Sequence, residues 1–266
     1  MGLNRAMWFN AGASYDPKYS ALLTYAQVQG YSLPSASVKT ALNNLCARFT
    51  ANNLWGQIEY FMTTDGDRNF AKINVANPGV NNAIEVNTPT FTSLYGFKSN
   101  GTTSCLRTGL LLQSGAVSYS QDNISTRIYL NDSVNANVIP YGCETTGHSY
   151  YHNLAKAANL EIVRSNQASS GSNKTLGDLK GFWEMARTGS TTGISYFNGL
   201  QSVSSGVASV TMPDKELYVL ASNDASAIEG YCTSNMGYFG LGPATLGKEL
   251  LRAAIWAEYF STVSPG

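Results

Sequence analysis

Charge is scarce in this sequence. Asp, Glu, Lys and Arg make up 13% of the 266 residues, whereas about a quarter is usual in globular proteins. The 17 basic residues balance 17 acidic ones, and no basic stripe runs through the chain, so we expect no nucleic-acid partner. Because 43% of the residues are hydrophobic, the low charge does not indicate disorder.

Long hydrophobic runs and an export signal are also missing. No stretch reaches the roughly 18 apolar residues of a membrane-spanning helix, so we expect no membrane insertion. Residues 1–10 carry one Arg and no apolar core long enough for a signal peptide. We therefore expect the chain to be made in the cytoplasm and not to be secreted through such a signal.

Cysteine pairs with metal-site spacing do not occur. Cys46, Cys105, Cys143 and Cys232 are far apart, and the sequence has only two histidines. A zinc site needs clustered ligands, so we predict none. Four free, mostly buried thiols are expected, with one or two disulfides as the alternative.

No catalytic constellation can be recognised. A glycoside hydrolase needs two carboxylates about 5 to 10 Å apart, which on one strand means acids two or four residues apart. Glu161, Glu184 and Glu216 instead stand alone in or beside their predicted strands. Nor is there a Gly-x-Ser-x-Gly motif or a glycine-rich phosphate loop. We expect no catalytic residue, no cofactor and no enzymatic activity, with a hydrolase built from distant residues as the open alternative.

What the sequence does contain is strand patterning, centred on residues 181–224. Residues 182–187 alternate between two faces, and Asn198-Gly199 is typical of a tight turn. Residues 217–221 are apolar throughout, which predicts a strand covered on both faces. Three adjacent strands of this kind form the kernel of an antiparallel sandwich. Further strands are predicted at residues 54–62, 90–97, 103–108, 124–130, 137–141, 160–164 and 236–240, with a hairpin turn at 99–101.

Helices are predicted at both ends of the sandwich. Asp16-Pro17 is a good helix start, and Ser35 or Ser37 caps a second helix, so the two form a hairpin. Their predicted apolar faces are Tyr19, Leu22, Leu23 and Ala26, then Val38, Leu42, Leu45 and Phe49. Thr245 caps a C-terminal helix whose main face is Leu246, Leu250, Ala253, Ala254, Ala257 and Phe260. That face is widened by Leu251, Ile255, Trp256 and Tyr259. We expect this helix to pack on the sandwich or to contact another subunit.

The most polar tight loop spans residues 63–69. Asp65, Asp67 and Asn69 imitate the start of a calcium-binding loop. Phe70 and Ala76 stand where such a loop needs Gly and Glu, which excludes an EF-hand. A looser ion site and a network of Asx-turns are both open.

Two aromatic segments are candidates for binding. Residues 142–153 are predicted to form a loop in which His148, Tyr150, Tyr151 and His152 either bind a glycan or partner, or only fill the surface. Residues 1–15 form an unpatterned arm with Met7, Trp8 and Phe9 in a row. That arm either covers the core or docks on a partner protein.

Several short motifs occur in an order that resembles one family. They are Leu23 to Ala26, Gly30 to Ser35, Thr64 to Ala71, Asn87 to Phe91, Tyr196 to Gly199, Leu217 to Asp224, and Gly240 to Gly242 followed by a helix. Together, over roughly residues 20–263, they resemble tailed-bacteriophage virion proteins found in tail, fibre and head-decoration roles. The resemblance implies a mainly β, antiparallel concanavalin A-like (laminin-G-like) jelly-roll sandwich with a helical lead-in, and no catalytic residues.

From these observations we expect a virion structural protein, a fibre, spike or decoration subunit. It would present a lectin-like sandwich to other virion proteins and to host-surface glycans, as a homo-oligomer. The expected units are an arm (1–15), a helical hairpin (16–62) and a sandwich with a C-terminal helix (63–266). The alternative function is a carbohydrate-binding module or lectin, and a glycan hydrolase comes third.

Overall fold

The computed structural model describes residues 15–115, 118–133, 137–155, 160–167, 177–224 and 227–263. The helices are α1 (Pro17–Val28), α2 (Ala36–Ala51) and α3 (Glu249–Val263), with short 3₁₀ turns at Trp55–Gln57 and Phe70–Lys72. One sheet, sheet A, contains β1 (Tyr60–Thr63), β3 (Thr90–Thr92), β4 (Gly96–Lys98), β6 (Ile124–Leu130), β10 (Gly181–Gly189), β11 (Thr192–Phe197), β12 (Leu200–Ser205) and β16 (Met236–Gly242). The other, sheet B, contains β2 (Ile84–Val86), β5 (Cys105–Leu111), β7 (Asn137–Thr145), β8 (His148–Ala155), β9 (Leu160–Gln167), β13 (Glu216–Val219), β14 (Ser222–Asn223) and β15 (Ile228–Glu229).

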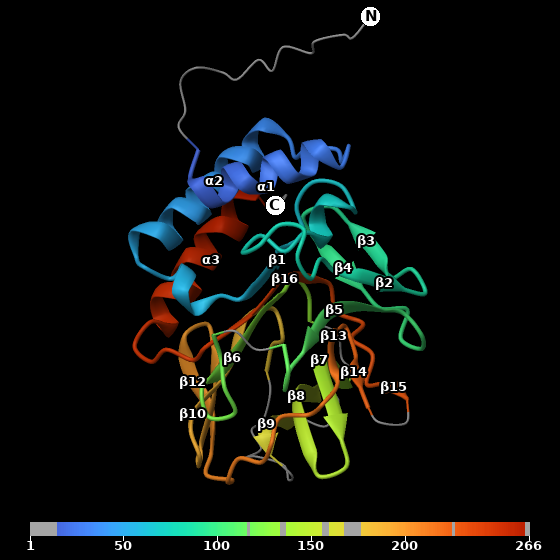
Figure 1. Ribbon diagram of the computed structural model, residues 1–266, viewed down its shortest axis with the longest axis vertical. Coiled ribbons are helices and arrows are strands. Elements are labelled where there is room, and N and C mark those ends of the chain that lie inside the picture. The colour runs from blue at the N-terminus through green and yellow to red at the C-terminus, as the bar shows by residue number, and fades with distance from the viewer. Residues whose placement is uncertain are drawn as a thin grey trace, which may run out of the picture.

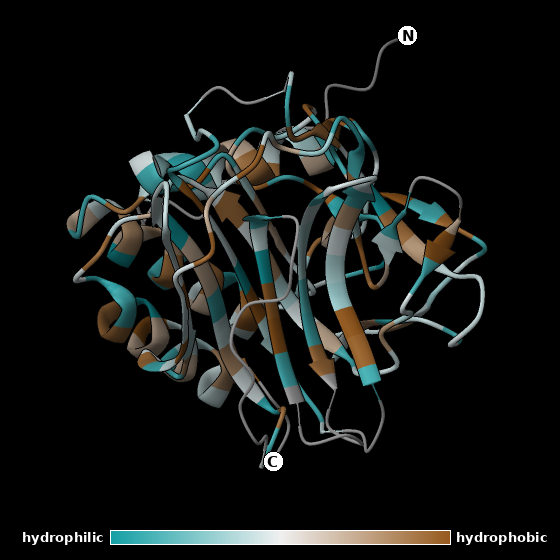
Figure 2. Ribbon diagram, turned by 90° about the horizontal axis from the view of Figure 1, so that it is seen from below, coloured by the Kyte–Doolittle hydropathy of each residue, from teal (hydrophilic) through white to brown (hydrophobic). Residues whose placement is uncertain are grey.

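The two sheets stack face to face, and the helices gather at one side of them (Figures 1 and 2). Two apolar cores lie between the layers. One fills the space between the sheets and includes Trp183 and Leu217. The other joins the helices to the outer face of sheet A and includes Phe61 and Trp256. Sheet A is therefore the middle layer, and the predicted mainly β sandwich with an N-terminal helical hairpin and a C-terminal helix is confirmed.

Nearly all strand pairing is antiparallel. Sheet A runs β12-β11-β10-β6-β16-β4-β3, with β1 also paired to β16. Sheet B runs β15-β14-β7-β13-β5-β2, and β8 and β9 extend it from β7. The exception is β14, which lies parallel to β7 with Ser222 opposite Gly142. This parallel contact brings the residues that follow β14 beside the end of β7.

The helical hairpin forms as its sequence predicts. Asp16 caps α1 by accepting the backbone N–H of Lys18, with Pro17 at the first helical position. Ser35 caps α2 in the same way, through the N–H of Val38. Both predicted apolar faces are buried and contribute to the core under the helices.

Strand β10 is buried on both faces because sheet A is the middle layer. Trp183 points between the sheets, and Phe182 points to the helices. The predicted alternation along residues 182–187 is confirmed. The prediction for residues 217–221 is wrong in part, because Tyr218 on β13 of sheet B is only half-buried.

Helix α3 packs against the sandwich and α2, but through a different face from the one predicted. Leu246 and Leu250 are exposed, and Ala254 and Ala257 are exposed as well. The buried residues are Glu249, Arg252, Ala253, Ile255, Trp256, Tyr259, Phe260 and Val263. The helix also starts at Glu249 and not next to Thr245. With apolar residues almost all round, the pattern did not specify which stripe faces inward.

Other segments differ from their predictions in detail. Residues 54–62 form a 3₁₀ turn before the short strand β1, and residues 90–97 divide into β3 and β4. Residues 99–101 join β4 of sheet A to β5 of sheet B, so they do not form a hairpin. The predicted boundary at residue 62 falls inside β1, a strand of sheet A, and the division into units stays a prediction.

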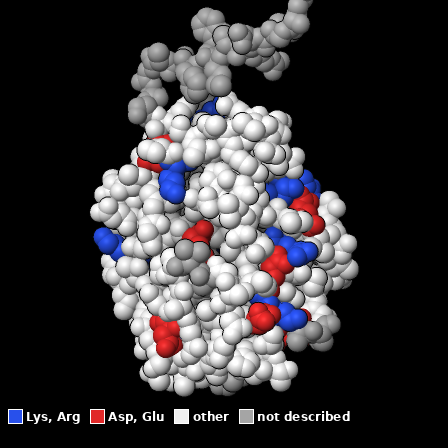
Figure 3. Space-filling view, in the orientation of Figure 1, with Lys and Arg blue, Asp and Glu red and all other residues white. Residues whose placement is uncertain are grey.

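The surface and the cysteines agree with the composition. On the face in Figure 3, charged atoms are sparse and acidic and basic atoms often adjoin. Cys46, Cys105, Cys143 and Cys232 are free and buried. Within the described ranges, no helix is both long and apolar enough to cross a membrane.

Candidate functional site

The predicted aromatic loop at residues 142–153 is a β-hairpin, so that prediction is wrong. Strands β7 and β8 pair with Cys143 opposite Tyr150 and Gly142 opposite Tyr151. Gly147, with a φ of 79°, turns the chain between them. Because neighbouring residues of a strand point to opposite faces, the four candidate side chains cannot form one surface.

Two of the four candidates face the core. Tyr150 and His152 are both 0% exposed. The hydroxyl of Tyr150 donates to Oγ1 of Thr126, 3.3 Å away in sheet A. Both side chains help to hold the sheets together, and neither reaches a ligand in solvent.

His152 belongs to a buried polar network between the sheets. Its Nε2 lies 2.8 Å from Oε1 of Glu161. The hydroxyl of Ser195 donates to the same oxygen and that of Ser202 to Oε2, at 2.5 Å each. Burial alone would raise the pKa of Glu161, but the bonds from His152 and the two serines hold that pKa below its ordinary value. Both serines donate to Glu161 and neither donates to His152, so the arrangement is not a nucleophilic triad.

The other two candidates lie at the surface of sheet B. His148, at the start of β8, is half-buried, and its Nδ1 is 2.9 Å from the carbonyl oxygen of Thr211. Tyr151 is half-buried on the face of sheet B that points away from the core. The guanidinium carbon of Arg164, on β9, lies 5.1 Å from the centre of its ring. That distance is within the range of a cation–π contact.

Polar groups surround Tyr151 on this outer face. Arg164 donates from Nη1 to Oγ of Ser149 at 3.3 Å. The same nitrogen is 3.5 Å from Oε2 of Glu144. Burial raises the pKa of Tyr151, against the opposing charge of Arg164, and Glu144 and Glu229 raise it further. The tyrosine ring is therefore the apolar centre of a charged, hydrogen-bonding patch.

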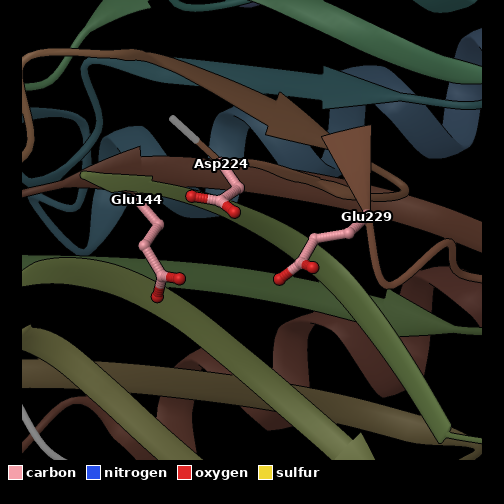
Figure 4. Close-up of side chains that lie close together, drawn as sticks. All are labelled: Glu144, Asp224 and Glu229. Atoms are coloured by element: carbon pink, nitrogen blue, oxygen red, sulfur yellow. The ribbon is translucent and has the colours of Figure 1, made fainter. Parts of the chain in front are cut away.

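Three carboxylates converge beside this ring. They belong to Glu144 at the end of β7, Asp224 just after β14 and Glu229 on β15, and one oxygen of each lies within 4.8 Å of the others. Figure 4 shows the three side chains extending toward a common space. Burial, then Asp224 and Glu144, raise the pKa of Glu229 above its ordinary value. We call Glu144, Tyr151, Arg164, Asp224 and Glu229 the outer-face cluster.

Reasoning from the sequence did not find the outer-face cluster. Glu144 lies far along the chain from Asp224 and Glu229, so no spacing of acids within one strand predicts that the three meet. The parallel contact of β14 with β7 brings Asp224 beside Glu144, and Glu229 follows because β15 pairs with β14.

The polar loop at residues 63–69 does not gather its acids. Asp65 is buried, at 2% exposed. Oδ1 of Asp67 accepts the backbone N–H groups of Asn69 and Phe70, and its Oδ2 accepts that of Ser32. These contacts are those of an Asx-turn network, and an ion site at Asp65, Asp67 and Asn69 stays a prediction. Met7, Trp8 and Phe9 lie outside the described residues.

Comparisons by sequence identify no relative: no family model matches the chain, and neither does any curated protein. Solved structures do match it. A mutant of Trypanosoma rangeli sialidase displaying trans-sialidase activity is 12% identical, with a TM-score of 0.52 over 82% of this chain and 39% of the sialidase chain.

Two botulinum neurotoxin structures match as well. One is of type C, for which cell entry depends on interaction with two ganglioside molecules; it is 11% identical, with a TM-score of 0.53 over 78% of this chain and 52% of the other. The receptor-binding domain of type D is 11% identical, with a TM-score of 0.50 over 77% of this chain and 54% of the other.

The fold is a lectin-like β-sandwich. At 11% to 12% identity these likenesses show the fold alone. The chain spans 39% of the sialidase and 52% of the type C neurotoxin chain, less than two thirds of either.

Proposed function

We propose that this protein is a non-enzymatic, glycan-binding subunit of a bacteriophage virion, and that it holds glycans through the outer-face cluster. The observation that carries the proposal is the position of Tyr151. Its ring is half-buried on an outward-facing sheet surface, with a guanidinium against it and three carboxylates beside it.

This combination suits a sugar for a chemical reason. A sugar ring offers an apolar face of C–H groups and an edge of hydroxyl groups. A tyrosine ring packs on the first, because its body is apolar and flat. Carboxylates and guanidinium groups accept from and donate to the second. The likeness to a neurotoxin that requires gangliosides for cell entry supports the same assignment.

The virion setting is supported by the sequence. The motifs that resemble tailed-phage virion proteins extend over residues 20–263, in the same order as in that family. Low charge with abundant Asn, Ser, Thr and Gly suits a surface protein. Other virion proteins are then the structural partners, and repeated use on one particle favours a homo-oligomer.

Glycan binding is tested with the purified chain on a glycan array and on host polysaccharide. Tyr151→Ala should lower affinity about tenfold or more, the loss expected for a central aromatic contact. Tyr151→Phe keeps the ring and should keep most of the affinity. The matched control is Tyr95→Ala, since Tyr95 is an exposed tyrosine in the turn between β3 and β4. Equal binding by the two alanine variants and the parent chain would refute the assignment of the site.

A glycan hydrolase is the second candidate, and one observation favours it. Glu229 has a raised pKa next to two further carboxylates, and a carboxyl group with a raised pKa can act as a general acid. The acids lie on an open sheet face, however, and the hollow beside α3 is lined by other residues, among them Phe182, Asn198 and Leu250. If the parent chain releases reducing sugar from host polysaccharide and Glu229→Gln does not, the proposed function changes from glycan binding to glycan hydrolysis.

A further inference from the structure

The three acids of the outer-face cluster lie close enough together to contact one ion. Glu144, Asp224 and Glu229 hold oxygens within 4.8 Å of one another. Arg164 forms an ion pair with Glu144, at 3.5 Å. Carboxylates this close repel one another, and a bound cation favours the charged form of every carboxylate that it contacts.

A buried hydroxyl on the same face independently indicates a ligand. Ser222 is 1% exposed, and its Oγ has no hydrogen-bond partner among the residues that the structure describes. Ser222 pairs with Glu229 across β15 and stands two residues before Asp224, so all three side chains project from one face of the sheet. Burying a hydroxyl without a hydrogen-bond partner is unfavourable, unless a ligand makes the contact that the protein does not supply.

Gly142 leaves room around that hydroxyl. A side chain at position 142 would begin 2.8 Å from Oγ of Ser222 and 2.7 Å from Cβ of Tyr151. Gly142 and Glu144 point to the same side of β7, since they are two residues apart. The Ser222 hydroxyl therefore lies on the same face of the sheet as the carboxylates, beside position 142, which pairs with Tyr151.

We propose that Glu144, Asp224, Glu229 and the Ser222 hydroxyl bind a divalent cation, with Ca²⁺ as the best match. The donors are all oxygen, which suits a hard cation, and the group contains no histidine or cysteine for zinc. Calcium takes six to eight oxygens in a flexible arrangement. Three carboxylates and a hydroxyl supply part of that shell, and water reaches the exposed Glu229 to supply more.

The cation also gives the glycan face a second contact. It lies next to Tyr151, because the charges of Glu144 and Glu229 are close enough to raise the pKa of the Tyr151 hydroxyl. Hydroxyl or carboxylate oxygens of a sugar stacked on Tyr151 can replace water on the metal. This role, but not the existence of the metal site, rests on the proposed glycan-binding function.

The metal site is tested with the metal alone. The EDTA-treated, desalted chain is titrated with CaCl₂ in a calorimeter and with TbCl₃ by luminescence excited through its aromatic residues. We expect saturable binding, with terbium displaced by calcium. Asp224→Asn and Glu229→Gln should weaken it at least about tenfold, the loss typical even for groups one step removed from a metal.

The matched control is Glu216→Gln. Glu216 is an acid of the same sheet, but it is bonded to Arg107 at 2.6 Å and lies outside the three-acid group. It should leave calcium affinity unchanged. The proposal is overturned by an absence of saturable heat and emission in the parent chain, or by equal losses in all three variants.

Glycan binding in EDTA and in CaCl₂ separates this inference from the proposed function. Glycan affinity that falls in EDTA and returns with calcium supports both. If the chain binds calcium but no glycan, the proposed function is refuted and the proposed metal site is still supported. Glycan binding that is equal in EDTA and calcium overturns the role of the cation at the glycan face.

Discussion

Glu184 lies between two guanidinium groups under α3. Its Oε1 accepts from Nη2 of Arg252 at 2.7 Å and from Nε of Arg127 at 3.2 Å, and all three residues are at most 2% exposed. Burial and the charge of Arg127 lower the pKa of Arg252. The backbone carbonyl oxygens of Gln57 and Pro243 accept from Arg127, and that of Thr245 accepts from Arg252. Because a buried charge needs such partners, this group fixes where α3 meets sheet A.

Asp65 is a buried acid of another kind. It is buried together with Tyr19 of α1 and Tyr259 of α3, and within the described part of the chain its Oδ2 has no hydrogen-bond partner. Burial raises its pKa from 3.8 to about 6, against weaker lowering by Tyr259 and Thr63. The folded chain therefore holds a proton that the unfolded chain releases, and stability should fall as the pH rises from about 4 to about 6.

This prediction is measured as the free energy of unfolding in urea between pH 4.5 and 7.5. A shift of about two pKa units corresponds to about 3 kcal/mol. The Asp65→Asn variant, which cannot ionise there, should remove most of that slope. Glu161 acts in the opposite sense, because its lowered pKa makes stability fall on acidification below its ordinary value of 4.5. Parallel profiles for the parent chain and the variant would show that Asp65 titrates normally.

Helix α3 illustrates how an element's packing depends on its surroundings. Trp256 is 0% exposed and stacks on Tyr238 of sheet A with ring centres 3.8 Å apart. Leu250 is 62% exposed on the same helix. The sequence alone ranked Leu250 in the main apolar face and Trp256 as an addition to it.

Alanine substitutions distinguish the two faces of α3. Trp256→Ala should destabilise the chain by about 3–5 kcal/mol, as expected for a large buried aromatic. Leu250→Ala should change stability by about 0.5 kcal/mol or less, since the side chain is mostly in water. Chemical unfolding measures both. Similar losses for the two variants would mean that Leu250 is covered, for instance by another subunit.

The hairpin of β7 and β8 shows the same dependence for a binding site. Its aromatic residues were recognised from the sequence, but as a loop with one surface. As a strand, β8 sends Tyr150 and His152 into the core and leaves Tyr151 outside. Of these three residues, only Tyr151 can contact a glycan.

For the whole molecule, the arm at residues 1–15 is the proposed link to the virion. Deletion of residues 1–10 should leave folding intact and abolish incorporation into phage particles. Changing Met7, Trp8 and Phe9 to Ser should have the same effect, because burial of apolar side chains drives most protein association. The matched control changes Asn4, Arg5 and Asn10 to Ser in the same arm.

Incorporation is measured by mass spectrometry of particles assembled with each variant, and folding by circular dichroism. Normal incorporation of the truncated chain would remove the arm from the assembly contact. Light scattering of the purified parent chain tests the expected homo-oligomer in the same preparations.

The sequence by itself determined the features that depend on neighbouring residues. Asp16 and Ser35 start the helices, and the alternation along residues 182–187 makes a strand. The low and balanced charge leaves no basic stripe in the sequence. These are local properties, because caps and periodicity act within a few residues. Tertiary structure decided which stripe of α3 is buried, that Asp65 lies under the helices, and that Glu144, Asp224 and Glu229 meet. Those outcomes depend on which distant strands pair and which layer covers each face, and the energy of such long-range contacts is not written in any one segment.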